Sequence, residues 1–196
     1  AKHGRVAVLY PMVASVEDLR AAQAVLERAR NEVAEETRSE PPAIKQGMMI
    51  EVPAAVHMLP ELLELCDFAS VGTNDLIQYV LAADRNSERM AAAYDIFHPA
   101  VLRILKHIRE SAVKLGKGVG ICGEIGGNTA FLPLLIGLGY RRVSVNVGLV
   151  PYVKDRVRHV REDESRQFAR EALKLSTAVE VHELAREFQD ATRAEE

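Results

Sequence analysis

The sequence lacks the features of a secreted, membrane-spanning or nucleic-acid-binding protein. Its 196 residues include only two cysteines, Cys66 and Cys122, too few for a disulfide framework. It has no signal-peptide pattern and no apolar run long enough to cross a bilayer, so we expect a cytoplasmic protein without membrane insertion. The 25 basic and 28 acidic residues form no basic block, which argues against nucleic acid as a partner.

Internal repeats and low-complexity segments are also missing, and what remains is an alternation of short apolar runs with helical patterns. The runs are short and bounded by glycine, proline or charge, as strands are. Five strands are predicted, over 5–10, 47–51, 68–72, 118–122 and 142–146. Strands that alternate with helices favour βα units and a parallel sheet.

Helical patterns fill the gaps between these strands. Ser15 and the acids after it are typical of a helix start. Helices are expected over 15–33, 53–65, 74–83, 99–115, 128–138 and 149–159, and 35–42 is expected to be a polar surface loop. The segment 162–196 is typical of two amphipathic helices with a break near Ser176 and Thr177.

The predicted fold is α/β, of the (β/α)₈ TIM-barrel type. Eight strands close such a barrel and five are visible, so we expect only the last five βα units. Residues 1–161 would form this partial barrel, and 162–196 a helical extension of the same domain. The chain opens on Ala1 and enters a strand by Arg5, which suggests that a longer protein precedes it.

Polar side chains follow three of the predicted strands. In a parallel α/β fold the strand C-termini meet at one rim, so Glu51, Asp75 and Cys122 are expected to share a site. Mg²⁺ prefers oxygen and usually takes one or two protein carboxylates, which Glu51 and Asp75 supply. The rival interpretation is a surface carboxylate at Glu51 and a helix-terminal acid at Asp75, capped by Asn74. The two are compatible, because a helix N-terminus also binds phosphate.

Several stretches carry a resemblance to a known family. They are MIEVPAA at 49–55, VGTNDLIQY at 71–79, LAADRN at 81–86, HPAV at 98–101 and GICGE at 120–124. In order and spacing they resemble the phosphoenolpyruvate (PEP)-binding barrel of the PEP-utilising enzymes. Within that family the pattern is most similar to enzyme I of the sugar phosphotransferase system, or to its nitrogen-regulatory form.

The resemblance implies a role for each of five residues. Glu51 and Asp75 would hold Mg²⁺, while Asn74 and Arg85 would bind the substrate. From the residues alone, Arg85 is as well explained as a surface arginine. Cys122 would act as a general acid that protonates the enolate left when the phosphoryl group departs. On residue type alone, Cys122 could also be an inert buried thiol, as we expect Cys66 to be.

Glu124 is a candidate to orient that thiol or a water, although a helix-capping role fits equally well. None of the six histidines has the sequence context of the family's phosphoryl acceptor. The resemblance therefore implies transfer from PEP to a histidine on another domain, then to a phosphocarrier protein, with release of pyruvate. It also implies a homodimer.

Two alternatives stay open from the sequence. The barrels of pyruvate phosphate dikinase and PEP synthase share these motifs, and a non-catalytic dimerisation or regulatory module is a further possibility. The chain departs from the family at 126–128, where Gly-Gly-Asn replaces Ala-Gly-Asp, and in lacking the early strands. An open five-stranded piece would expose sheet edges.

Overall fold

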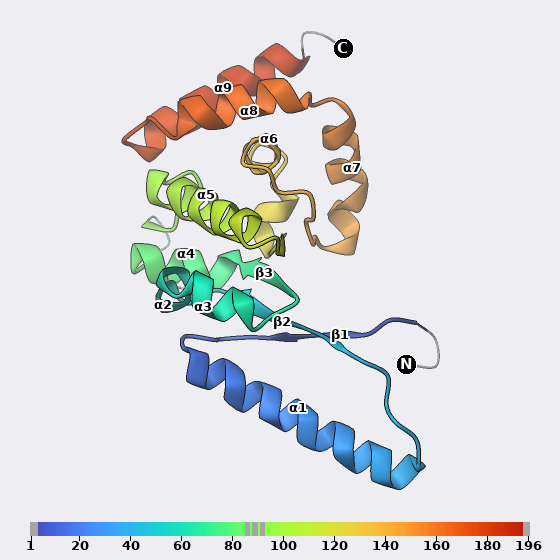
Figure 1. Cartoon of the computed structure of the whole chain (residues 1–196). Helices are drawn as coiled ribbons and strands as arrows, with labels where there is room; N and C mark the ends of the chain where they lie inside the picture. The colour runs from blue at the N-terminus through green and yellow to red at the C-terminus, as the bar shows by residue number, and fades with distance from the viewer. Residues whose placement is uncertain (1–3, 85–86, 88–89, 91–92, 194–196) are drawn as a thin grey trace.

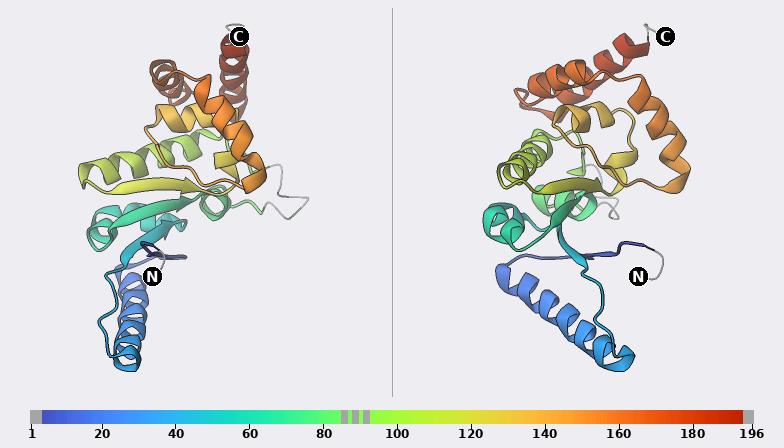
Figure 2. Two further views of the ribbon diagram at one scale, coloured as in Figure 1. Left: turned by 90° about the vertical axis from the view of Figure 1, so that its right-hand side faces the viewer. Right: turned by 45° about the vertical axis from the view of Figure 1, so that its right-hand side comes forward.

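A computed structural model of the chain describes residues 4–84, 87, 90 and 93–193. The N-terminal helix α1 lies at one end of the molecule and the C-terminal pair α8 and α9 at the other (Figures 1 and 2). Four parallel strands form one sheet in the order β1-β2-β3-β4. Their bounds are β1 Ala7–Tyr10, β2 Lys45–Ile50, β3 Phe68–Gly72 and β4 Gly118–Cys122.

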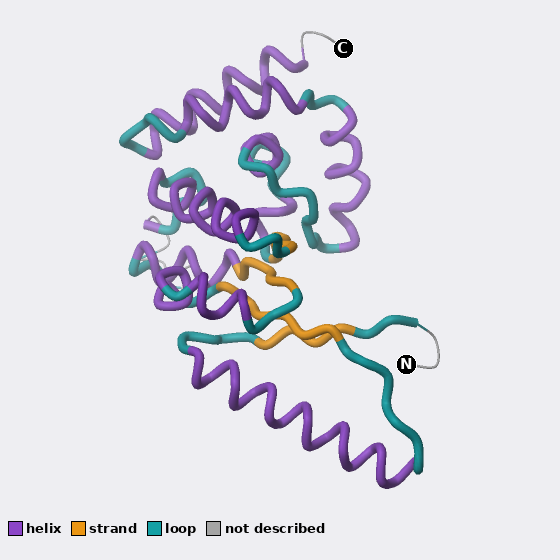
Figure 3. Tube along the Cα trace, in the orientation of Figure 1, coloured by secondary structure: helices purple, strands orange, loops and turns teal. Residues whose placement is uncertain are grey.

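Helices connect and follow these strands (Figure 3). The α-helices are α1 Val16–Thr37, α2 Pro53–His57, α3 Leu59–Glu64, α4 Thr73–Leu81, α5 Pro99–Lys114, α6 Leu132–Gly137, α7 Val150–Arg158, α8 Glu162–Ala172 and α9 Ala178–Arg193. Short 3₁₀ helices in the described residues include η2 Glu124–Gly127 and η3 Val147–Leu149. No helix in the described part of the chain is long and apolar enough to span a bilayer.

The sheet has the arrangement of consecutive units in a (β/α)₈ barrel. Each strand pairs with the next one in sequence, without the reversal of strand order that defines a doubly wound sheet. Successive helices also touch, α1 against α3 and α3 against α5, so they cover the same face. Both features are typical of a barrel wall, and they confirm the predicted α/β fold class.

The fifth predicted strand, 142–146, is present as a single parallel bridge. Ile121 donates its N–H to the Arg142 carbonyl at 2.9 Å, and Ser144 donates to the Ile121 carbonyl at 2.8 Å. The pairing goes no further because the chain turns at Asn146, whose side chain accepts the Gly148 N–H at 3.0 Å and caps η3.

Three predicted helices differ in detail from the observed ones. The one expected over 128–138 is shorter, since α6 spans only Leu132–Gly137 and the Asn128 side chain forms a turn before it. The helix expected over 53–65 is divided at Met58 into α2 and α3. Pro60 explains the division, since it has no N–H to donate to the carbonyl four residues earlier. The first helix begins as predicted, with Ser15 in a capping box, but runs on to Thr37 into the segment expected to be a loop. Glu35 and Glu36 are good helix formers, and Arg38 ends the helix in a left-handed conformation.

The two faces of the sheet are buried to different degrees. Side chains on the helix-covered face are fully buried, among them Met48, Ile50, Val71 and Ile121. The alternating positions on the other face are only partly buried, namely Leu9, Met49, Ser70, Gly120 and Cys122. In a closed barrel this second face points into the interior. At its C-terminal edge the polar residues of the candidate site follow.

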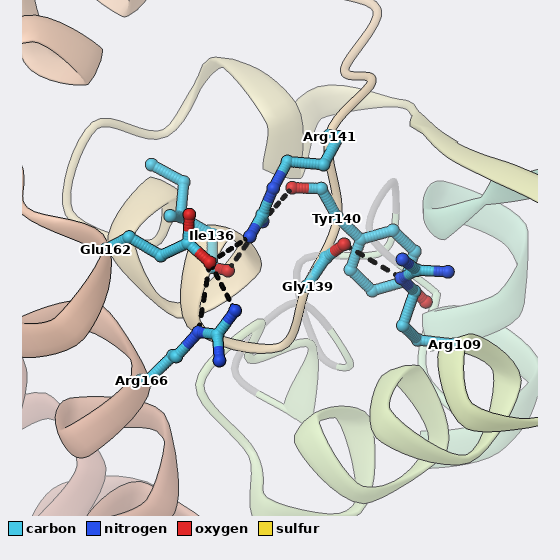
Figure 4. Close-up of polar contacts among 7 residues, drawn as sticks. All are labelled: Arg109, Ile136, Gly139, Tyr140, Arg141, Glu162 and Arg166. Carbon is cyan, nitrogen blue, oxygen red and sulfur yellow. Dashed lines mark hydrogen bonds and ion pairs between the residues drawn. The ribbon is translucent and has the colours of Figure 1, made fainter. Parts of the chain in front are cut away.

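The C-terminal helices pack on the same core as the barrel units. Phe168, Ala169 and Ala172 of α8 are buried, and a side chain at Gly137 of α6 would collide with the backbone of Ser165. Polar contacts reinforce this junction (Figure 4). Glu162 of α8 pairs with Arg141 and Arg166, and Arg141 also donates to the carbonyls of Ile136 and Tyr140.

Candidate active site

A row of three residues crosses the C-terminal edge of the sheet. Glu51 comes directly after β2, Gly72 ends β3, and Cys122 ends β4. Gly72 and Cys122 are partners in the parallel register, and Glu51 continues the register that pairs Ile50 with Val71. Because Gly72 has no side chain, the Glu51 carboxylate can extend over position 72, between the strand ends that carry Glu51 and Cys122.

Glu51 is held tightly although it is acidic. Its side chain is only 4% exposed, and Oε1 accepts the Met12 N–H at 2.7 Å. A Cβ at Gly72 would lie 2.8 Å from the Glu51 Cβ and still closer to Oε2, so the carboxylate occupies the space left by the glycine. Met12 has a φ of 53°, a left-handed conformation that is uncommon for a residue with a side chain.

Asp75 lies beside Glu51. Gly72 is the N-cap of α4, and Asp75 is in the first turn of that helix. Burial is the largest cause of a raised pKa at Glu51, the Met12 N–H opposes it, and the charge and hydrogen bonding of Asp75 raise the pKa further. The two carboxylates therefore repel each other when both are ionised, and a cation between them would relieve this repulsion.

The carboxylate pair fits Mg²⁺ better than a softer metal. Within the described residues, no cluster of three or more His, Cys, Asp or Glu side chains is arranged to hold a metal. Mg²⁺ needs only one or two carboxylates, with water and substrate oxygens completing its octahedron. Glu51 and Asp75 are therefore a sufficient protein contribution to such a site.

Asn74 and Glu124 meet between the ends of β3 and β4. The Asn74 Oδ1 accepts the backbone N–H of Glu124 at 3.0 Å. This bond leaves the NH₂ end of the Asn74 amide as its donor towards a ligand. The contact comes from the main chain of Glu124, whose side chain is exposed.

Thr73 makes a contact that the sequence analysis did not anticipate. Its side chain is 1% exposed, and Oγ1 donates to the Cys122 carbonyl at 2.9 Å. The motif alone gives little signal for this bond, because its partner is 49 residues away. The sequence signal for Thr73 is its place in the chain, as a hydroxyl residue directly before the two candidate site residues Asn74 and Asp75.

The Cys122 thiol is a protonated donor. Its Sγ donates to the Val71 carbonyl at 3.1 Å. Burial raises the pKa of the Cys122 thiol, a hydrogen bond with Ser70 lowers it, and the nearby charge of Glu51 raises it. Such a group keeps its proton at neutral pH. Burial also raises the pKa of the Cys66 thiol, to about 11, but Cys66 lies in the core and away from the candidate site.

A pocket of about 310 Å³ adjoins Asn74 at the same edge. Its lining comes from the β4 end, η2 and the segment before η3, and it includes Gly123, Glu124, Ser144 and Asn146. The structure thus brings five of the six predicted site residues to one rim, namely Glu51, Asn74, Asp75, Cys122 and Glu124. The sixth, Arg85, lies outside the described residues.

Comparison with protein families gives this rim its context. Residues 1–162 match the model of the PEP-utilising enzyme, PEP-binding domain. The chain belongs to this family. The family resemblance seen in the sequence is thereby confirmed, and all the candidate residues at the rim fall within the matched part of the PEP-binding domain.

Three curated relatives of this PEP-binding domain come from bacteria. The chain is 44% identical over 186 residues to a Salmonella typhimurium protein named phosphoenolpyruvate-dependent phosphotransferase system. It is 38% and 35% identical over 185 residues to proteins named phosphoenolpyruvate-protein phosphotransferase from Haemophilus influenzae and Staphylococcus carnosus. Each alignment covers 94% of this chain, but 25% of the Salmonella protein and 32% of the other two. The chain therefore spans about a quarter to a third of these relatives.

A solved structure shares the fold of the PEP-binding domain at low sequence identity. It is a citrate lyase from Burkholderia xenovorans, with a TM-score of 0.61 and 16% identity, and the match covers 97% of this chain and 65% of that one. At this identity the likeness shows the fold alone. It agrees with the α/β barrel type inferred from the strand order.

Proposed function

We propose that this chain is the PEP-binding part of a PEP-dependent protein-histidine phosphotransferase of the enzyme I kind. The main observation behind this proposal is the row of Glu51, Gly72 and Cys122, with Asp75 beside it, in a chain of the PEP-binding family. The names of relatives that are 35–44% identical support a phosphotransferase over the dikinase or synthase alternative.

The proposed substrate binds at the rim, with its phosphate near the start of α4. The N-terminal N–H groups of α4 and the NH₂ of Asn74 donate to phosphate oxygens. Arg85, carried over from the family motif, neutralises phosphate charge with its planar fork of donors. Glu51 and Asp75 would hold Mg²⁺, which when bound supplies positive charge to phosphate and carboxylate oxygens.

Cys122 completes the proposed reaction. In-line attack by a histidine of another domain takes the phosphoryl group and leaves the enolate of pyruvate. The Cys122 thiol then gives its proton to the methylene carbon, forming the methyl group of pyruvate, and the thiolate regains a proton from water. A raised pKa suits this role, because a general acid must arrive protonated.

Three further features belong to the same proposal. The acceptor histidine and the phosphocarrier lie outside this chain, and the complete protein is a homodimer. Residues 162–196 are an extension of the barrel domain, supported by the packing of α8 on α6. The proposed setting is the cytoplasm, where PEP is available.

Phosphoryl transfer in the complete protein tests the proposal. The protein that contains this chain is incubated with PEP, Mg²⁺ and a histidine phosphocarrier, and pyruvate and phosphohistidine are measured together. Equal amounts of both, without ATP, are expected. Pyruvate formation that requires AMP with phosphate or pyrophosphate, and that yields ATP, would favour the dikinase or synthase. No turnover would favour a non-catalytic module.

A further inference from the structure

Two hydrogen bonds fasten the start of α4 to the end of β4. Thr73 Oγ1 donates to the Cys122 carbonyl at 2.9 Å, and Asn74 Oδ1 accepts the Glu124 N–H at 3.0 Å. The first bond is inaccessible to water, since Thr73 is 1% exposed. The turn that carries the carboxylate and amide ligands is thereby joined to the turn that carries the thiol.

The junction has no spare room. Gly123, between the two anchored residues of the β4 end, has a φ of 108°. A Cβ there would lie 2.9 Å from the Asn74 Oδ1 and would collide with the Thr73 hydroxyl. The close contact therefore requires glycine at position 123, and moving the β4 end away from α4 would break both hydrogen bonds.

The Thr73 hydroxyl does not serve its own helix. Gly72 is the N-cap of α4 and provides no side-chain cap, while the Thr73 hydroxyl points away from the helix to the neighbouring strand end. Thr73 is the first residue of α4 and not its N-cap, so this contact is not a helix cap.

The bond acts on the residue that carries the thiol. Cys122 is the last residue of β4, and Gly72 is its last partner in the ladder. Beyond that pair the ladder no longer fixes the main chain, so the Cys122 carbonyl depends on Thr73 for its orientation. The same backbone unit carries the side chain whose Sγ lies on the Val71 carbonyl.

We propose that Thr73 is a positioning residue for Cys122: its hydroxyl fixes the Cys122 carbonyl and thereby the place of the thiol at the site. This inference rests on the proposed function for its catalytic meaning. The structural part of the proposal, that the Thr73 hydroxyl holds the Cys122 thiol in place, does not depend on PEP chemistry.

Thiol alkylation tests the structural content in this chain alone. Iodoacetamide labelling of Cys122 is followed by peptide mass spectrometry in the wild type, Thr73→Val and Thr73→Ser. Valine keeps the shape and removes the hydroxyl, whereas serine keeps the hydroxyl. We expect Cys122 to react about fivefold or more faster in Thr73→Val, because a freed thiol leaves its partly buried place, and Thr73→Ser to stay near the wild type.

Cys66 is the internal monitor of folding, since it is 4% exposed and lies just before β3, at the end of that strand opposite to the junction. If Cys66 also reacts faster in Thr73→Val, the comparison moves to Thr73→Ala against Thr73→Ser, which differ only by the hydroxyl. Cys122 labelling at the wild-type rate in the folded valine or alanine variant would overturn the positioning role.

Turnover in the complete protein tests the catalytic meaning. A displaced acid slows the chemical step without removing phosphate contacts, so Thr73→Val is expected to lower kcat for pyruvate about tenfold or more. The KM for PEP should change less than about threefold, and Thr73→Ser should recover most of the rate. A changed KM with unchanged kcat would contradict positioning. A wild type that makes no pyruvate from PEP would refute the proposed function and leave the alkylation result to decide the role of Thr73.

Discussion

The carboxylate of Glu51 lies over Gly72, in the space that a side chain at position 72 would need. The glycine that ends β3 is thus part of the site, although it contributes no functional group. It lets a buried carboxylate and a thiol from the two flanking strands approach the same point.

Replacing Gly72 with alanine tests this relationship. The new methyl group must displace Glu51 or the Met49 side chain, whose Sδ would lie 2.9 Å away. We expect Gly72→Ala to lower the free energy of unfolding by about 1–3 kcal/mol and to weaken Mg²⁺-dependent PEP binding about tenfold or more. Gly148→Ala is the matched control, because a Cβ there meets only Asn146 Oδ1 at 3.7 Å. Urea unfolding and calorimetry measure both effects, and wild-type PEP affinity in Gly72→Ala would contradict the geometry.

The pH dependence of stability in Glu51→Gln and the wild type separates two effects of Glu51: the cost of burying its charge and its binding of a metal. Burial raises the pKa of Glu51 in the folded chain above the ordinary value of 4.5, so the folded state holds its proton more tightly than the unfolded state. The stability that this gives is fully present below pH 4.5 and is lost as pH rises through the higher folded value. Without metal, the melting temperature of the wild type should therefore fall relative to that of Glu51→Gln between pH 4.5 and neutrality.

Added Mg²⁺ with PEP should reverse this order at pH 7, because only the ionised carboxylate binds the metal. Thermal melts over a pH series measure both parts, and in a chain of this size about 1 kcal/mol corresponds to a shift of about 2–4 °C. A wild type that gains stability over Glu51→Gln with rising pH, in the absence of metal, would show that Glu51 is not held in a desolvated place.

Met12→Gly tests the backbone support of Glu51. Met12 is left-handed, at a φ of 53°, and glycine adopts this conformation without the steric cost of about 1–2 kcal/mol. The N–H that Glu51 accepts is kept, so we expect a gain of about 1 kcal/mol in the free energy of unfolding and unchanged PEP affinity. Arg38→Gly is a control at a second left-handed position, far from the site, with a φ of 50°. A loss of PEP binding in Met12→Gly would mean that the Met12 side chain itself contributes.

Cys122→Ala tests the general acid. In the complete protein, PEP binding should be nearly unchanged, because the thiol adds no charge, while pyruvate formation should slow by about 10²-fold or more. Stopped-flow measurement of phosphohistidine and pyruvate separates the two steps, and phosphoryl transfer is expected to outrun pyruvate release in the variant. Pyruvate formation at the wild-type rate would remove Cys122 from the mechanism.

The sequence predicted those parts of the site that depend on local pattern. Short apolar runs ending in Glu51 and Cys122 identified the strand ends, and the parallel fold then placed these residues at one rim. The helix start at Ser15 and the helix start at Pro99 were equally local, and both are confirmed.

The parts that escaped prediction depend on contacts between distant segments. Met12 contributes only an N–H, so its side chain gave no signal of its role towards Glu51. Thr73 acts on a carbonyl 49 residues away, and the importance of Gly72 lies in the volume that it leaves for a neighbouring strand. The strand predicted over 142–146 pairs only once, because Asn146 turns the chain into η3.

Calorimetric titration of PEP into this chain, with and without Mg²⁺ and beside Glu51→Ala, is the most direct test of the account. The account predicts saturable binding that requires both the metal and Glu51, since the row of Glu51, Gly72 and Cys122 with Asp75 already forms the rim on these strands. A folded chain that binds no PEP, or binds it equally well without Mg²⁺ and without the Glu51 carboxylate, would contradict it.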